Sequence, residues 1–123
     1  MNSIKKILVI DDEKINIMAL ANILKPQYEI IIAKNGASGI KAAEKHLPDI
    51  ILLDIIMPEM DGYDVLAKLK RIEEVKNIPV IFISGLMDAD LDKEKNLLLG
   101  AVDYISKPFD KSVVKDKIDS YLK

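Results

Sequence analysis

The sequence predicts an α/β fold in which a parallel sheet of five strands is covered by helices on both faces. Five short apolar runs, rich in Ile and Val, have the length and composition of strands. The segments between them carry apolar residues three and four positions apart, the period of a helix with one buried face. Because two parallel strands need a long crossover, usually a helix, this alternation indicates a parallel sheet.

The strands are expected where the apolar runs stop at polar or turn-forming residues. They cover residues 7–10, 28–33, 50–53, 79–83 and 101–106. The third run ends at Asp54, and Pro58 followed by Asp61-Gly62 then marks a loop. An ionised carboxylate inside a buried strand would be costly. Asp54 is therefore expected at the carboxyl end of its strand, where the sheet opens to solvent.

Five helices are expected after the strands. Four of them have apolar stripes made of Ile17, Leu20, Ala21 and Leu24; of Ala37, Ile40, Ala43 and Leu47; of Val65, Leu66, Leu69 and Ile72; and of Val113, Val114, Ile118, Tyr121 and Leu122. The remaining helix, which is the fourth in chain order, is expected over residues 88–99. Asn35 and Asp110 are placed to cap two of these helices, because a short polar side chain before a helix accepts hydrogen bonds from its first turn.

Length and composition exclude several classes of protein. With 123 residues, the chain is expected to form one domain, residues 1–123, with its own core. The absence of cysteine excludes disulfides and thiolate metal sites. No apolar run is long enough to span a membrane, and a formal charge of -2 gives no basic surface for nucleic acid. We expect a cytoplasmic protein that binds neither a membrane nor nucleic acid.

Polar side chains gather at one edge of the predicted sheet, because parallel strands all end there. Asp11 and Asp12 follow the first strand, Asp54 the third, Ser84 the fourth and Lys107 the fifth. Neighbouring carboxylates repel one another unless a cation lies among them, and a set of oxygen ligands suits Mg²⁺ or Mn²⁺. Lys107 and Ser84 can bind phosphoryl oxygens, so Asp54 is a candidate nucleophile that forms an aspartyl phosphate.

Each of these residues also has a plain structural explanation. An Asp after a strand is commonly a turn former or a helix cap, and the pair Asp11-Asp12 also suits the start of a helix. Ser84-Gly85 is a common turn sequence, and a lysine near a strand end is commonly just exposed. Their joint placement at one edge favours a functional site over separate structural roles.

The order and spacing of these motifs resemble the receiver domain of the two-component response-regulator family along the whole chain. The resemblance is carried by residues 7–13 (ILVIDDE), 53–62 (LDIIMPEMDG) and 100–109 (GAVDYISKPF). It implies a flavodoxin-like, doubly wound sheet with strand order 2-1-3-4-5, flanked by five helices. It also implies a cis peptide bond before Pro108.

The resemblance assigns roles to individual residues. Asp54 would be the phosphoacceptor, and Lys107 and Ser84 would contact its phosphoryl group. Tyr104 occupies the position of the family's switch aromatic, which turns inward when the hydroxyl residue is drawn to the phosphate. Family members commonly have Thr where this chain has Ser84. The hydroxyl is kept, and only the size of the switch is in question.

The resemblance also implies the ligands of the metal. Asp12, Asp54 and the main-chain carbonyl of Ile56 would bind Mg²⁺, with Asp11 reaching it through water. The implied function is a phosphorylation-controlled switch that takes a phosphoryl group from a sensor histidine kinase, a phosphotransfer protein or a small phosphodonor. It would catalyse its own phosphorylation and dephosphorylation without being a turnover enzyme.

Two other functions stay open. A phosphohydrolase of the haloacid-dehalogenase type also forms an aspartyl phosphate, but it needs a second acid two residues after the nucleophile, where this chain has Ile56. An unphosphorylated interaction module on the same scaffold is disfavoured, because no member of the acidic, hydroxyl and lysine set is missing. The chain ends at Lys123, after the last predicted helix. It is expected to be either a stand-alone receiver or one excised from a larger protein.

The predicted helix over residues 88–99 suggests a partner surface. Consecutive leucines at 97–99 cannot all face the sheet, because neighbours on a helix point about 100° apart. Leu91 and Leu98 share one stripe, and receivers commonly use this helix with the fifth strand and fifth helix as their output face. We expect a homodimer or an output partner at Leu91, Leu98 and Tyr104. The alternative is that these leucines complete the core.

Overall fold

A computed structural model describes residues 4–85 and 99–122. The five strands form one parallel sheet in the order β2-β1-β3-β4-β5, which confirms the predicted topology. They are β1 (Lys6–Ile10), β2 (Glu29–Ala33), β3 (Ile50–Asp54), β4 (Val80–Gly85) and β5 (Asp103–Lys107). The sheet is therefore an open, doubly wound one, whose ligand-binding edge lies beyond the carboxyl ends of its strands.

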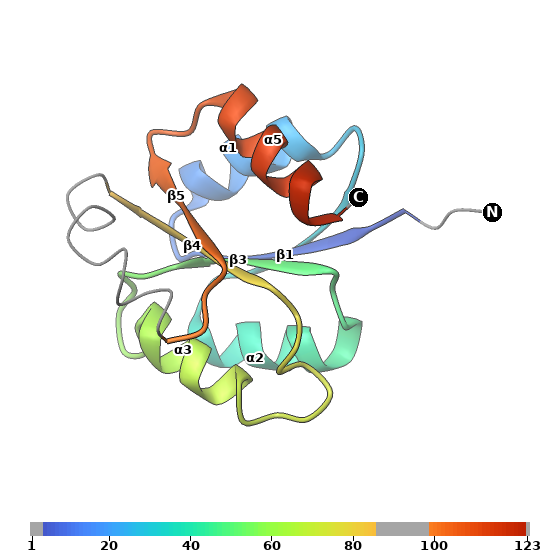
Figure 1. Ribbon diagram of the computed structural model, residues 1–123. Coiled ribbons are helices and arrows are strands. Elements are labelled where there is room, and N and C mark those ends of the chain that lie inside the picture. The colour runs from blue at the N-terminus through green and yellow to red at the C-terminus, as the bar shows by residue number, and fades with distance from the viewer. Residues whose placement is uncertain (1–3, 86–98, 123) are drawn as a thin grey trace.

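Four helices lie in the part of the chain that the structure describes. They are α1 (Lys14–Leu24), α2 (Gly36–His46), α3 (Gly62–Leu69) and α5 (Lys111–Leu122). Helices α1 and α5 cover one face of the sheet, and α2 and α3 cover the other (Figure 1). The helix predicted over residues 88–99 lies outside the described residues except for Leu99, as do Leu91 and Leu98. The structure therefore bears on four of the five predicted helices.

The sheet separates two apolar cores, as expected for strands covered on both faces. Ile7 and Val9 of β1 pack with α1 and α5, whereas Leu8 and Ile10 pack with α2 and α3. All four side chains are fully buried. Burying one such side chain contributes about 1.5–3 kcal/mol. The alternating side chains of β1 thus hold the helices of both layers against the sheet.

The predicted stripe of α2 is wrong at both ends. Ala37 and Leu47 are exposed, whereas the predicted Ile40 packs against the core and the predicted Ala43 is buried together with Gly36 and Gly39. A Cβ on Gly39 would lie 2.6 Å from the Cδ1 atom of Ile10, so only glycine lets the helix pack this closely. Glycine has no apolar side chain, so the apolar period did not identify Gly36 and Gly39 as residues that face the sheet.

The predicted caps are confirmed. The Asn35 side chain accepts a hydrogen bond from the Ser38 backbone N–H (2.8 Å), and that of Asp110 accepts one from the Val113 N–H (3.1 Å). These contacts satisfy backbone donors that have no partner within the helix. Among the described residues, no helix has the length and apolar character needed to cross a membrane.

Candidate functional site

The carboxyl ends of four strands bring the predicted polar residues to one edge of the sheet. Asp54 is the last residue of β3 and Lys107 the last of β5, while Ser84 lies near the end of β4. Asp11 directly follows β1, where its backbone N–H donates to the Ala33 carbonyl of β2 (3.1 Å). This convergence follows from parallel pairing, because every strand runs toward the same edge.

The three aspartates form an acidic cluster. One carboxylate oxygen from each of Asp11, Asp12 and Asp54 lies within 4.8 Å of the others. Asp11 is fully buried and Asp54 is 2% exposed, whereas Asp12 is exposed. The cluster thus has two buried carboxylates and one that opens to solvent, so an ion could enter from the Asp12 side.

The Asp11 carboxylate has one satisfied oxygen and one that is not. Its Oδ1 atom accepts the Glu13 backbone N–H (2.9 Å). Its Oδ2 atom is buried and has no hydrogen-bond partner among residues 4–85 and 99–122. A buried acceptor without a partner is costly and commonly marks the place of a bound water or ion. An all-carboxylate donor set with such an oxygen fits a hard divalent cation.

Lys107 supplies the positive charge that faces this cluster. Its Nζ atom donates to Asp54 Oδ1 (3.3 Å) and lies 3.7 Å from Asp11 Oδ2, an ion-pair distance that is too long for a hydrogen bond. It also lies 4.0 Å from Glu13 Oε1. One ammonium group cannot neutralise this many carboxylates. The site therefore remains attractive to a further cation.

The pKa of the Asp54 carboxyl is raised from 3.8 to about 7. Burial is the main cause, because it disfavours the charged form, and repulsion by Asp11 adds to it. The Lys107 ammonium opposes both effects and lowers this pKa. Asp54 is thus poised to change protonation near neutral pH, as a group does when its environment is built for chemistry.

We expect Asp54→Asn to stabilise the metal-free protein at about pH 8, by about 1–3 kcal/mol, because it removes a buried charge. The folded protein keeps a proton on Asp54 up to about pH 7, whereas the unfolded chain releases it near 3.8. The folded state thus binds more protons over this window, and the free energy of unfolding falls as pH rises through it. Urea denaturation in EDTA at several pH values tests this.

The stability gain in Asp54→Asn should disappear below about pH 4, where wild-type Asp54 is protonated in both states. Asp116→Asn, the same substitution at an exposed position of α5, provides the control. A variant no more stable than wild type at high pH would contradict the raised pKa.

Ser84 and Tyr104 lie on the same face of the sheet. Ser84 is buried, and its hydroxyl donates to the Gly85 carbonyl (3.2 Å). Tyr104 is half-buried and pairs with Phe82 of β4, so Ser84 is its diagonal neighbour one pleat further along. The two residues that the resemblance links as a switch are therefore neighbours on one surface of the sheet.

Ile56 lies in the loop between β3 and α3, with its side chain 64% exposed. The peptide bond between Lys107 and Pro108 is cis, as the resemblance implies. The structure thus places Asp11, Asp12, Asp54 and Lys107 in one cluster, and Ser84 and Tyr104 on adjoining strands. The roles of these residues remain predictions.

Sequence reasoning missed how the loop after Asp54 is held. Asp61 is not merely a turn residue, because its side chain accepts the Asp64 N–H (2.9 Å) and Asp64 accepts the Asp61 N–H (3.2 Å). This capping box starts α3 at Gly62, whose N–H donates to the Ile55 carbonyl (2.7 Å). The sequence signal for this capping box is the pair of acidic residues Asp61 and Asp64, three positions apart.

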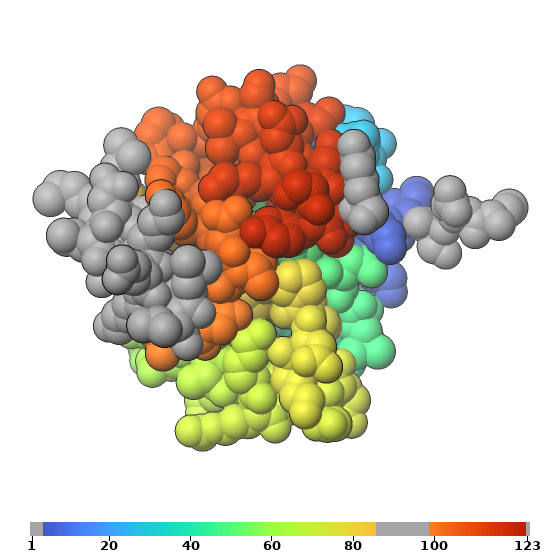
Figure 2. Space-filling model, viewed as in Figure 1, coloured from blue at the N-terminus to red at the C-terminus, as the bar shows by residue number. Residues whose placement is uncertain are grey.

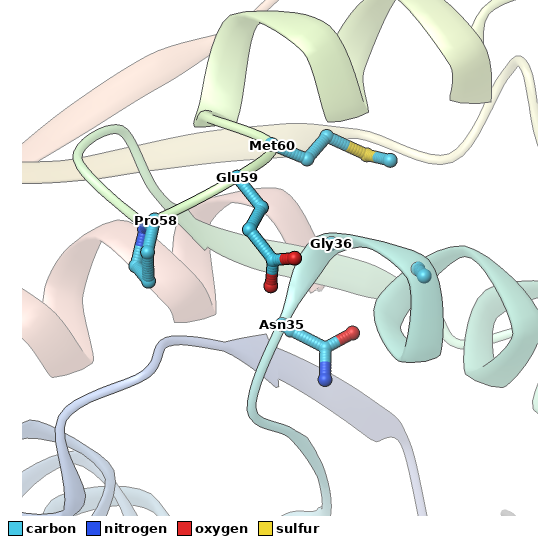
Figure 3. Close-up of a pocket in the computed structure, with 6 residues that line it drawn as sticks. Asn35, Gly36, Pro58, Glu59 and Met60 are labelled. Atoms are coloured by element: carbon cyan, nitrogen blue, oxygen red, sulfur yellow. The ribbon is translucent and has the colours of Figure 1, made fainter.

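A separate pocket lies beside the amino end of α2, facing the loop between β3 and α3 (Figure 3). It is lined by Asn35, Gly36, Ala37, Pro58, Glu59 and Met60. Among these lining residues, Glu59 is the sole ionisable one, and none of the predicted site residues contributes to the pocket. It offers no constellation for catalysis, so the acidic cluster is the candidate site.

The chain matches the response regulator receiver domain family over residues 7–119. It is 42% identical over 106 residues to the response regulator PleD of Caulobacter vibrioides, an alignment that covers 85% of this chain and 23% of PleD. It is 32% identical over 118 residues to the protein PilH of Pseudomonas aeruginosa, covering 95% of this chain and 97% of PilH. The chain thus spans about a quarter of PleD and nearly all of PilH.

Solved structures share the fold. The receiver domain of the sensor histidine kinase PA1611 from Pseudomonas aeruginosa superimposes with a TM-score of 0.87 at 24% identity, covering 98% of both chains. That structure is described as having a magnesium ion coordinated in its active site cleft. At this level of identity the likeness establishes the fold.

Proposed function

The chain belongs to the response regulator receiver domain family, and from this premise we propose that it is a phosphorylation-controlled switch whose phosphoacceptor is Asp54. The observation that carries the proposal is the environment of Asp54, a buried carboxylate held between a lysine and two further aspartates. No simple turn former or helix cap needs such a setting. We further propose that residues 1–123 form one receiver domain that works in the cytoplasm.

Asp12, Asp54 and the main-chain carbonyl of Ile56 would hold Mg²⁺ directly and Asp11 would hold it through water, and Mn²⁺ would fit the same oxygen ligands. When bound, the ion supplies positive charge that offsets the carboxylates and the incoming phosphoryl oxygens. The Oδ2 atom of Asp11 supports this proposal, because it is a buried oxygen of the cluster that has no hydrogen-bond partner among the described residues. A bound cation would also favour the ionised, nucleophilic form of Asp54.

In the proposed reaction, an Asp54 carboxylate oxygen attacks the phosphorus of a phosphohistidine or of acetyl phosphate. The new bond joins that oxygen to phosphorus, and the bond from phosphorus to the imidazole nitrogen or the acetate oxygen breaks, its electron pair leaving with the donor. Lys107 would bind a phosphoryl oxygen, and Ser84 would donate its hydroxyl to another. Water later attacks the phosphorus, the bond between phosphorus and the Asp54 oxygen breaks, and inorganic phosphate leaves while the Asp54 carboxylate is restored.

The partners follow from this chemistry. The donor would be a sensor histidine kinase, a phosphotransfer protein or a small acyl phosphate. Movement of Ser84 toward the phosphoryl group would free space beside Tyr104, its diagonal neighbour, and Tyr104 would turn inward. The surface formed by β5, α5 and residues 88–99 would then bind a second copy of the chain or an output partner more tightly. We place Leu91 and Leu98 on that surface only as a sequence-based proposal.

Acetyl phosphate with Mg²⁺ tests the function. Intact-mass spectrometry should show the gain of one phosphoryl group in wild type and none in Asp54→Asn. Asp116→Asn, on the exposed side of α5, should be phosphorylated as wild type is. Steady release of phosphate from many phosphoesters would instead indicate a phosphohydrolase. No modification at all would indicate an unphosphorylated interaction module.

The order of metal affinities is a second prediction. We expect Asp12→Ala to weaken Mg²⁺ binding about tenfold or more, and more than Asp11→Ala does, because a direct ligand contributes more than one acting through water. Isothermal titration calorimetry measures both affinities. Equal affinities, or a larger loss in Asp11→Ala, would contradict the proposed assignment of ligands.

The lifetime of the phosphoryl group is a third prediction. Ile56 is exposed in the loop after Asp54 and cannot orient an attacking water by hydrogen bonding. We expect slow self-dephosphorylation that becomes about tenfold faster in Ile56→Asn, which adds a polar side chain there. Decay of the phosphorylated mass after donor removal gives the rate, and Ile56→Leu is the control. A half-life that is unchanged or longer in Ile56→Asn would refute the expectation.

A further inference from the structure

A charged network joins β5 to α5 at the outer edge of the sheet. The Asp103 Oδ1 atom accepts the Tyr104 N–H (2.8 Å) and the Lys117 ammonium (3.0 Å), and its Oδ2 atom accepts the Tyr121 hydroxyl (3.2 Å). The Tyr121 hydroxyl also lies 3.1 Å from the Val102 carbonyl. Figure 2 shows β5 and α5 adjoining on one face of the molecule. The network lies away from the acidic cluster and is not used by the proposed reaction.

Lys117 makes three contacts in this network, and two of them fix its position. Its Nζ atom donates to Asp103 Oδ1 and to the Tyr104 main-chain carbonyl (2.8 Å), neither of which depends on the orientation of the Tyr104 ring. The third contact does depend on the ring, because the same ammonium lies 5.0 Å from the ring centroid. This distance is within the range of a favourable cation–π interaction.

The ring position over Lys117 is here called outward, because a turn toward Ser84 would carry the ring away from the ammonium. Tyr104 is half-buried and packs beside Phe82. Tyr104, Ser106 and Lys117 also line a groove at β5. Ser84, buried next to Phe82 on the same face, is the residue proposed to move on phosphorylation. Lys117 remains hydrogen-bonded to the backbone of β5 and cannot follow the ring inward. The cation–π contact therefore favours the outward ring.

We propose that Lys117 is a positioning residue that holds the Tyr104 ring outward in the unphosphorylated protein and so sets the threshold of the switch. This inference rests on the proposed function, because it concerns the coupling between Asp54 and the surface of β5 and α5. Removing the ammonium raises the resting population of the inward ring. A ligand that favours the inward ring then binds more tightly, because less of its binding free energy is used to shift the equilibrium.

The test uses Lys117→Met, which keeps the length of the side chain and removes its charge. Beryllofluoride, a mimic of the phosphoryl group, is titrated in saturating Mg²⁺ by calorimetry and by fluorine NMR of protein labelled with fluorotyrosine. The Tyr104 resonance is assigned with Tyr104→Phe. We expect the apparent affinity for beryllofluoride to increase about two- to fivefold, the factor that corresponds to one exposed cation–π contact. The unliganded Tyr104 resonance should also move toward its position in the beryllofluoride complex.

Two matched variants separate positioning from a merely structural role. Lys117→Arg keeps a cation over the ring and should restore the wild-type affinity. Lys115→Met removes a charge from the same helix at a side chain with no ion pair or hydrogen bond to the described residues, and it should leave the affinity unchanged. General damage to the fold would weaken beryllofluoride binding, which is the opposite of the expected result.

The remaining outcomes overturn the proposal in distinguishable ways. Unchanged or weaker beryllofluoride binding in Lys117→Met, while acetyl phosphate still adds its phosphoryl group to Asp54, rejects the role of Lys117 and leaves the proposed function standing. Equal effects of Lys117→Met and Lys117→Arg reject the cation–π contact as the cause. If acetyl phosphate does not modify wild type, the proposed function and the role of Lys117 fail together.

Discussion

Lys107→Met is expected to slow phosphorylation of Asp54 by acetyl phosphate about 10²- to 10³-fold, the usual cost of losing a group that stabilises transition-state charge. The Lys107 ammonium lies 3.3 Å from Asp54 Oδ1, on the surface that an incoming phosphoryl group must approach. Its side chain is 21% exposed, so water screens it only partly. Initial rates from intact-mass spectrometry, at saturating Mg²⁺, measure the loss.

Mg²⁺ affinity provides the internal control for Lys107→Met. Removing a positive charge 3.7 Å from Asp11 Oδ2 leaves the carboxylates less neutralised, so Mg²⁺ should bind as tightly as in wild type or more tightly. Slow phosphorylation combined with retained metal binding identifies an electrostatic role. A variant that loses both would show that Lys107 holds the site together, and a rate within about threefold of wild type would contradict its role in phosphoryl transfer.

The residues of the site could be predicted from the sequence, but their distances and charge state could not. That Asp11, Asp54 and Lys107 would meet follows from one rule, because parallel strands end at one sheet edge. Their distances do not follow from it. The unpaired Oδ2 atom of Asp11 and the raised pKa of Asp54 depend on side-chain burial, which only the packed structure determines. Sequence therefore predicted the membership of the cluster and not its charge state.

Strands were predictable because buried parallel strands are apolar throughout, but their ends were not. Ser84 and Gly85 were expected to follow the fourth strand and instead belong to β4, where they pair with Ser106 and Lys107. The partner strand supplies this pairing, so no local signal marks it. Likewise, no sequence signal distinguishes Lys117 from the other lysines of α5. Its contacts with β5 arise from tertiary packing alone.

Glycine shows a further limit of sequence reasoning, and its role after Asp54 leads to a large expected effect. The sequence of Asp61-Gly62 indicates a loop, yet Gly62 is the first residue of α3 and packs on the backbone of β3. A Cβ at this position would lie 2.5 Å from the Asp54 carbonyl oxygen and 2.7 Å from the Ile55 Cα. Neither atom can move aside without displacing the residue that we propose as phosphoacceptor.

Gly62→Ala is therefore expected to lower the free energy of unfolding by about 3 kcal/mol or more, because backbone atoms must shift and the hydrogen bond from Gly62 to the Ile55 carbonyl is strained. Urea denaturation measures the loss. Gly36→Ala is the matched control, since Gly36 is the first residue of α2 and a Cβ there would meet side-chain atoms rather than backbone, with the Met60 Sδ at 2.7 Å and the Val65 Cγ2 at 2.8 Å.

That contrast decides the cause of the Gly62→Ala effect. Both substitutions add one methyl group at the first position of a helix, so helix propensity changes equally and only the neighbouring atoms differ. Side chains can adjust more easily than the backbone of β3, the Met60 end more than buried Val65, and Gly36→Ala is expected to cost about 1–2 kcal/mol. Folded Gly62→Ala should also be phosphorylated more slowly, because the carbonyl of Asp54 and its carboxylate move together. Equal destabilisation by the two variants would show that close approach to β3 is not what requires glycine at position 62.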